Sequence, residues 1–388
     1  MSRYHSYLNT SVTILTAYKG EEPFAGYIKQ FFSANKKYGS KDRKQISHLC
    51  YCYFRTGKAL TELSVEDRIV AGLFLCSSEE SEILTFLKAE WSLHTGLSIK
   101  EKLSLIDKDL LVEQIFPWKE ECSEGLSAEL FTESFLQQPD LFLRMRPENE
   151  KQVKTKLKNA AIEFTSLSNT CLALSNNTKI DTILETDKEV VIQDYSSQRV
   201  GEFFPMNIDG NIKTVWDCCA ASGGKSILAK DVFTNIQLTV SDVRENILFN
   251  LKKRFSAAGI NNYKSFLADL SNSKQAIPAE SFDLIIADVP CSGSGTWSRT
   301  PEQLYYFEPA KIDEYAKLQK SILNNVIVAM KTGGYFLYIT CSVFKKENED
   351  AVNFLLEKFN LKVLKMELLK GYELKADTMF VALLQKQL

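Results

Sequence analysis

The sequence is poor in histidine and has no long apolar run. Its 388 residues include three histidines, His5, His48 and His94, which lie far apart, so we expect no metal site. No stretch is apolar for long enough to span a bilayer. The first ten residues, MSRYHSYLNT, lack the apolar core of a signal peptide. We therefore expect a cytoplasmic protein without a membrane partner.

The positive and negative charges nearly balance, and the cysteines are odd in number. A formal net charge of −2 argues against indiscriminate nucleic-acid binding but leaves room for a local basic groove. Nine cysteines without an export signal indicate reduced thiols rather than a disulfide framework. The hydrophobic fraction of 45% is ordinary for a globular protein. The length suggests two or three domains, and we expect a monomer.

Residues 1–138 are predicted to form an all-α bundle. Apolar residues recur at helical spacing in stretches such as 24–32 and 46–54. Ser64, with an acid three residues later, has the pattern of a helix N-cap. We interpret Cys50 as a core residue, because it lies on the apolar face of its predicted helix.

Residues 139–190 are predicted to form a short α+β connector. The segment LFLRMRP, 141–147, has the pattern of a strand that enters a loop. Residues 148–161 have a polar-faced helical pattern, and CLALS, 171–175, again resembles a strand. The connector therefore links the helical bundle to a third region.

Residues 191–388 are predicted to form an α/β domain. Short apolar segments alternate with helical ones, and two closing strands are expected in the tail. The predicted strands of the alternating part are 213–218, 237–242, 265–269, 282–289 and 335–341. This alternation is typical of a doubly wound, mostly parallel sheet.

A strand, a turn of small residues and a helix follow one another in VWDCCAASGGKS, 215–226. A small turn lets backbone amides approach a ligand at the helix N-terminus. A Walker A loop would need a glycine six residues before Lys225, where Cys219 stands, so a P-loop is excluded. The nicotinamide pattern G-x-G-x-x-G is absent as well.

Three successive strands of this domain end in aspartate. Asp242 ends the strand after the turn, Asp269 the next one and Asp288 the fourth. One such aspartate is often only a helix N-cap. Three in order at the carboxyl ends of parallel strands favour an adenosine pocket. We expect Asp242 to accept the ribose hydroxyls and Asp269 to meet the adenine edge.

Two cysteines stand in loops at the same edge of the predicted sheet. Cys291 follows the fourth strand and Cys341 the fifth. A pocket that Lys225 lines would lower a thiol pKa and so raise the thiolate fraction. A thiolate that adds to C6 of cytosine makes C5 able to accept a methyl group from a sulfonium donor. Asp288 would hold N3 and the amino group. Spacing does not decide which cysteine attacks.

At these residues the sequence resembles the RNA 5-methylcytosine methyltransferases of the Sun/Fmu or NOP/Sun family. The resemblance rests on DCCAASGGKS, IADVPCSGSGTWSRTP and YITCSVFKKENED, and it covers about residues 190–388. The segment IQDYSSQRV, 192–200, resembles the segment that precedes that family's catalytic domain, and MFVALLQK resembles the last strand of that domain. DRKQISHLCYCYFRTGK, 42–58, more loosely resembles the RNA-binding, NusB-type domain of bacterial small-subunit methyltransferase B.

The family resemblance implies a fold, a cofactor and roles for single residues. It implies a class I methyltransferase with a Rossmann-like sheet that binds S-adenosylmethionine and methylates RNA, and the expected substrate is 16S ribosomal RNA. Cys341 would be the nucleophile, Cys291 would assist product release and Asp288 would contact the cytosine. Asp242, Asp269, Asp288 and the turn would border the cofactor. The residues of the turn are Cys219, Ala220, Ala221, Ser222, Gly223, Gly224 and Lys225.

The sequence departs from the family pattern at two positions. Ser222 replaces a proline in the turn, which we expect to loosen it, and Val289 replaces an alanine and adds bulk beside Asp288. We further expect Trp297 and Arg299 to touch nucleotides that flank the target cytosine.

Basic residues cluster in three places and suggest phosphate contacts, which would position RNA without specifying its sequence. The clusters are Lys36, Lys37, Lys41, Arg43 and Lys44; Lys151, Lys154, Lys156 and Lys158; and Lys252, Lys253 and Arg254. Such runs are as often only solvated faces. An alternative function is that of a catalytically silent RNA-binding or ribosome-assembly factor on the same fold. The presence of both cysteines and all three strand-end acids argues against it.

Overall fold

The computed structural model of the protein describes residues 2–205, 212–275, 277 and 281–387. The chain divides into two compact units. The first comprises Met1–Glu120, Ser127–Gln138 and Thr296–Pro309, and the second comprises Glu121–Leu126, Pro139–Gly295 and Ala310–Leu388. The finer division into three domains stays a prediction. Within the described ranges, no helix is long and apolar enough to cross a membrane.

The first unit is helical. Its helices are α1 (Arg3–Ala17), α2 (Phe24–Ala34), α3 (Ser40–Arg55), α4 (Val65–Cys76), α5 (Glu82–Leu87), α6 (Ala89–Ser92), α7 (Ile99–Ile106), α8 (Ala128–Ser134) and α13 (Pro301–Tyr306). The Ser64 hydroxyl accepts the N–H of Asp67 at 3.1 Å, which confirms the predicted N-cap of α4. Cys50 is fully buried, as predicted for a core residue.

The expectation that Trp297 touches RNA is wrong. Its side chain is fully buried and packs in the first unit against the rings of Phe116, Trp118 and Phe307. Burial in an aromatic cluster removes the large apolar indole from water, which stabilises the fold more than exposure on a loop would. Trp297 is therefore a core residue.

The second unit begins with a small antiparallel sheet in the order β2-β3-β1-β4. Its strands are β1 (Leu141–Met145), β2 (Thr165–Ser166), β3 (Cys171–Leu174) and β4 (Val190–Ile192). Helix α9 (Glu150–Asn159) buries Val153 and Leu157 against this sheet. The strand, helix and strand predicted for the connector are confirmed.

The larger sheet of the second unit has seven strands in the order β10-β11-β9-β8-β5-β6-β7. They are β5 (Thr214–Asp217), β6 (Gln237–Asp242), β7 (Tyr263–Leu267), β8 (Phe282–Asp288), β9 (Met330–Thr340), β10 (Leu361–Leu369) and β11 (Met379–Lys386). Strands β5 to β9 are parallel, whereas β11 pairs antiparallel with β9 and with β10. The predicted mostly parallel, doubly wound sheet is confirmed.

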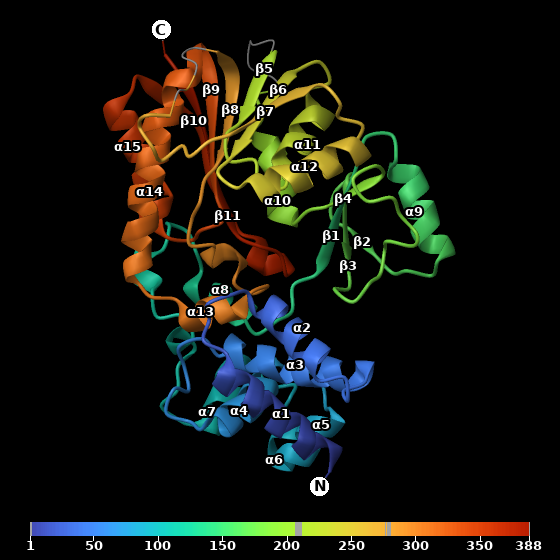
Figure 1. The fold of residues 1–388 in the computed structure, drawn as a ribbon. Coiled ribbons are helices and arrows are strands. Elements are labelled where there is room, and N and C mark those ends of the chain that lie inside the picture. The colour runs from blue at the N-terminus through green and yellow to red at the C-terminus, as the bar shows by residue number, and fades with distance from the viewer. Residues whose placement is uncertain (1, 206–211, 276, 278–280, 388) are drawn as a thin grey trace. The chain divides into compact units, whose positions relative to one another are not determined.

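Helices cover both faces of this sheet, as Figure 1 shows. Helices α11 (Gly224–Val232) and α12 (Glu245–Ala257) pack with α10 (Tyr195–Arg199) and the following turn on one face. Helices α14 (Ala310–Val326) and α15 (Glu349–Lys358) cover the other. Alternate residues of each central strand point to opposite faces, so both faces contribute to the core. This burial explains why the central strands are almost wholly apolar.

Candidate active site

Acidic and thiol side chains stand at the carboxyl ends of neighbouring parallel strands. Asp217 ends β5, Asp242 ends β6 and Asp288 ends β8. Cys341 directly follows β9. The chain continues from β5 and from β8 toward opposite edges of the sheet, so these adjacent strands form the topological switch point. Ligands of open α/β sheets bind at this point.

The turn between β5 and α11 is shaped to expose backbone amides. Gly223 is the N-cap of α11 with a φ of 87°, and Ala221 has a φ of 45°. A side chain at Gly223 would collide with the ring of Phe255 and would also crowd Leu251. Only glycine fits this position without strain. The first amides of α11 are thereby left for a ligand.

Asp242 is buried and holds the turn. Its Oδ2 accepts the N–H of Ala221 at 3.0 Å, and its Oδ1 accepts the N–H of Arg244 at 3.0 Å. The Nε of Arg244 also donates to Oδ1 at 3.1 Å, so Oδ2 is the oxygen that keeps a second lone pair. That the carboxylate accepts ribose hydroxyls stays a prediction.

Asp269 differs from the other two predicted acids. It lies two residues beyond β7, and it is exposed. Its Oδ1 accepts the N–H of Ser271 at 3.0 Å and the hydroxyl of Ser271 at 2.6 Å. These bonds are those of a local turn. Its contact with an adenine stays a prediction.

Lys225 interacts with one of the strand-end acids and with one of the cysteines. Its Nζ forms an ion pair with Asp288 Oδ2 at 2.9 Å. Burial lowers the pKa of Lys225, but the charges of Asp288 and Cys341 outweigh it, so the pKa is raised. The ammonium group therefore stays positive at neutral pH, and it interacts electrostatically with Cys341.

The two predicted cysteines lie side by side. Cys291 Sγ and Cys341 Sγ are 3.2 Å apart, and both residues are half-buried. The hydrogen bond to Cys341, burial, and the negative charge of Glu347 raise the pKa of Cys291 well above its usual value. The pair is therefore asymmetric, since Lys225 acts on Cys341 while Glu347 acts on Cys291.

Two buried acids of this site were not singled out from the sequence. Asp217 Oδ2 accepts the Ser226 hydroxyl at 2.6 Å, while Oδ1 has no partner among the described side chains. Burial raises the pKa of Asp217 to about 7. Glu347 accepts the N–H of Ser292 at 2.7 Å, and burial raises its pKa. Both acids could have been found in the sequence. Asp217 directly precedes the turn, and Glu347 is one of the acids that follow Cys341.

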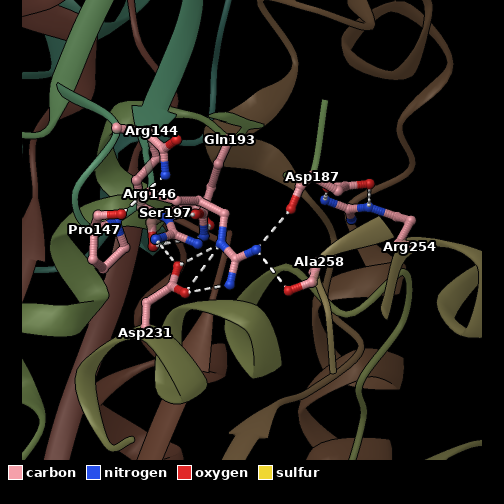
Figure 2. Close-up of polar contacts among 10 residues, drawn as sticks. Arg144, Arg146, Pro147, Asp187, Gln193, Ser197, Asp231, Arg254 and Ala258 are labelled. Carbon is pink, nitrogen blue, oxygen red and sulfur yellow. Dashed lines mark hydrogen bonds and ion pairs between the residues drawn. The ribbon is translucent and has the colours of Figure 1, made fainter. Parts of the chain in front are cut away.

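The connector braces the helix that begins at the turn. Figure 2 shows Arg144 and Arg146 converging on Asp231 in the last turn of α11. The N–O distances are 2.5 Å from Arg144 and 2.7 Å from Arg146. In the same view Arg254 of α12 pairs with Asp187 of the connector at 2.7 Å. The two connector arginines and Asp187 thus fix α11 and α12.

Arg254 also explains how the turn accommodates a serine. Its Nη1 donates to the Ser222 carbonyl at 3.0 Å and to the Ser222 hydroxyl at 2.9 Å. These bonds restrain the turn at the position where the sequence led us to expect a looser one. Val289, the second departure from the family pattern, is buried in the core between the sheet and α14.

The described residues contain no cluster of three or more histidine, cysteine, aspartate or glutamate side chains that could hold a metal ion.

Some basic residues of two predicted clusters already have acidic partners within the protein. Lys156 pairs with the buried Glu189 at 2.7 Å, and Arg254 belongs to the network of the turn. Lys151 and Lys158 of α9 and Lys252 of α12 are exposed.

Comparison with solved structures places this fold. The crystal structure of PH0851 matches 97% of this chain and 97% of its own with a TM-score of 0.70 at 19% identity. A methyltransferase homolog from Pyrococcus horikoshii matches 73% and 98% with a TM-score of 0.56 at 21% identity. NSun6 from Pyrococcus horikoshii, solved with SFG, matches 71% and 96% with a TM-score of 0.57 at 14% identity. These likenesses establish the fold alone.

Comparison with known sequences shows which family this chain resembles. Residues 206–385 match the family described as 16S rRNA methyltransferase RsmB/F. The probable ribosomal RNA small subunit methyltransferase B of Synechocystis is 29% identical over 270 residues, 66% of this chain and 59% of the relative. That of Bacillus subtilis is 29% identical over 198 residues, 51% and 44% of the two chains. The chain thus spans about half the length of these curated relatives. Residues 206–385 of this chain are thus similar in sequence to the RsmB/F methyltransferases.

Proposed function

We propose that this chain transfers a methyl group from S-adenosylmethionine to C5 of a cytosine in RNA, most directly 16S ribosomal RNA. The observation that supports this best is the pair of thiols 3.2 Å apart beside the Lys225–Asp288 ion pair. A catalytically silent RNA-binding protein on the same fold would have no need of two adjacent thiols. The relatives named for small-subunit ribosomal RNA supply the substrate class.

S-adenosylmethionine fits the residues at the switch point. The amides of the turn, the carboxylate of Asp242 and the unpartnered Oδ1 of the buried Asp217 supply donors and acceptors there. SFG, an analogue of S-adenosylmethionine, accompanies the NSun6 structure of the same fold. When bound, the cofactor supplies a methyl group on a sulfonium sulfur.

Cys341 is the proposed nucleophile. Its thiolate, favoured by Lys225, attacks C6 of the cytosine and forms a C–S bond, which moves electron density to C5. Asp288 lies beside Lys225 and holds the ring at N3 and the amino group as charge develops. With S-adenosylmethionine held at the switch point, C5 would accept the methyl group that this cofactor supplies. Loss of the C5 proton to a base lets the C–S bond break and returns the Cys341 thiolate, a release that Cys291 assists.

The cytosine must leave its stack to reach both thiols, so the substrate is a loop or a splayed base. The test is methyl transfer from labelled S-adenosylmethionine to 16S ribosomal RNA and to transfer RNA, with nucleosides identified by mass spectrometry. We expect 5-methylcytosine with the unaltered chain and none with Cys341→Ala. Cys76→Ser, at a half-buried cysteine of α4, is the matched control and should leave the product unchanged. Label in any other nucleoside would contradict the proposal.

A further inference from the structure

Glu347 touches the residue that follows each cysteine. It ends the short turn Lys345–Glu347 after the Cys341 loop and is fully buried. Its Oε2 accepts the N–H of Ser292 at 2.7 Å, and its Oε1 accepts the hydroxyl of Ser342 at 2.8 Å. Ser292 follows Cys291, and Ser342 follows Cys341. One carboxylate therefore links two loops that are far apart in the sequence.

Further hydrogen bonds join the same two loops. The hydroxyl of Ser294 accepts the N–H of Val343 at 2.9 Å. The N–H of Gly295 donates to the carbonyl of Cys341 at 2.8 Å. From α14, Gln319 Nε2 donates to the carbonyl of Pro290 at 3.0 Å and lies 3.5 Å from Glu347 Oε2. The loops thus form one hydrogen-bonded body with the Glu347 carboxylate inside it.

Different charged groups act on the two cysteine sulfurs. Glu347 acts on Cys291, whereas Lys225 of α11 acts on Cys341. Tyr315 of α14 and Tyr338 of β9 also face the cluster, and Glu314 and Glu349 act on these tyrosines. The pKa of each tyrosine is raised, chiefly by burial, so neither is charged at neutral pH.

We propose that Glu347 is a positioning residue that binds the two cysteine loops together and keeps Cys291 a thiol, so that attack on the substrate falls to Cys341. This inference rests on the proposed function, because it says which of the two sulfurs can attack. A like charge disfavours ionisation of a neighbouring group. As a thiol, Cys291 can donate a hydrogen bond to the Cys341 sulfur 3.2 Å away and so stabilise it as a departing thiolate when the C–S bond to the substrate breaks.

The test is the pH dependence of alkylation by iodoacetamide, measured for each cysteine by peptide mass spectrometry at low conversion on the full chain. In the unaltered protein Cys341 should react at lower pH than Cys291. In Glu347→Gln the Cys291 profile should move to lower pH by at least about one unit, because a neighbouring like charge is removed. Glu347→Asp keeps the charge, so it should keep the Cys291 profile. Glu314→Gln, at an exposed acid of α14, is the matched control and should change neither profile.

An unshifted Cys291 profile in folded Glu347→Gln would overturn the inference. A carboxylate with a purely structural role would leave the pH dependence of Cys291 alkylation unchanged when it is replaced. If Glu347→Gln does not fold, the order of the two cysteines in the unaltered protein decides, and earlier reaction of Cys291 overturns the inference. The proposed function fails separately, through absence of 5-methylcytosine from the unaltered chain. The alkylation profiles need neither cofactor nor RNA, so the two failures are distinguishable.

Discussion

The carboxyl group of Asp217 shows how far burial changes the chemistry of one side chain. Its pKa is raised to about 7 mainly by burial, with the charges of Asp288 and Asp242 adding to the effect. A carboxyl whose pKa is higher in the folded than in the unfolded state stabilises the fold fully below its unfolded pKa. That contribution is lost as the pH rises toward 7.

Asp217→Asn cannot ionise and therefore escapes this loss. Its free energy of unfolding should rise relative to the unaltered protein between about pH 4 and pH 8, by up to about 4 kcal/mol, since each pKa unit is worth about 1.4 kcal/mol. Thermal melts across this range test it, and a difference independent of pH would contradict it.

Asp283→Asn should behave oppositely, because hydrogen bonds to Lys331 and to the backbone outweigh burial and lower the pKa of Asp283. It should be destabilised at neutral pH and recover below about pH 4.

Asp242 is the residue on which the assignment of the cofactor pocket depends. Asp242→Ala should weaken binding of S-adenosylmethionine by about 1.5–3 kcal/mol, the usual loss for a hydrogen bond to a charged group. Titration calorimetry measures this, with Glu245→Ala as the matched control, because Glu245 is an exposed acid at the start of α12. Unchanged affinity in Asp242→Ala would show that the pocket is assigned wrongly.

At the scale of elements, α12 restrains the turn between β5 and α11 through one side chain, Arg254. Arg254→Ala removes the ion pair with the buried Asp187 and two hydrogen bonds to Ser222. We expect a loss of about 1–3 kcal/mol in stability, because a buried charge loses its partner, together with weaker cofactor binding. Lys252→Ala, at an exposed lysine of the same helix, should change neither. Equal melting temperatures for the two variants would contradict this role of Arg254.

The elements themselves could be predicted from the sequence, whereas their distant contacts could not. Alternating apolar segments predicted the parallel strands, and the sequence placed an aspartate at the end of β6 and of β8, where the structure has them. The bond between Glu347 and Ser292 spans 55 positions, which no periodicity records. Trp297 was misplaced for the same reason, since Phe116 and Trp118, which pack against it, come from a distant segment of the chain.

At the scale of the whole molecule, a net charge of −2 means that RNA affinity depends on where the lysines lie. If exposed lysines such as Lys151 and Lys158 of α9 meet phosphates, affinity should fall steeply with added salt. Replacing both with glutamine should reduce the slope of log affinity against log salt by about 1–2. Lys156→Gln is the contrast, because Lys156 already pairs with Glu189. A flat salt dependence in the unaltered protein would show that these lysines are only solvated.

The central claim is that Cys341 forms the bond to the substrate, and trapping that bond tests it most directly. Cys291→Ala should still attack and methylate but release product slowly, because attack needs only a thiolate and release needs separate proton transfer. It should accumulate a protein–RNA adduct that survives denaturing electrophoresis and disappears in Cys291→Ala combined with Cys341→Ala. An adduct that persists in Cys341→Ala and vanishes in Cys291→Ala would contradict the account.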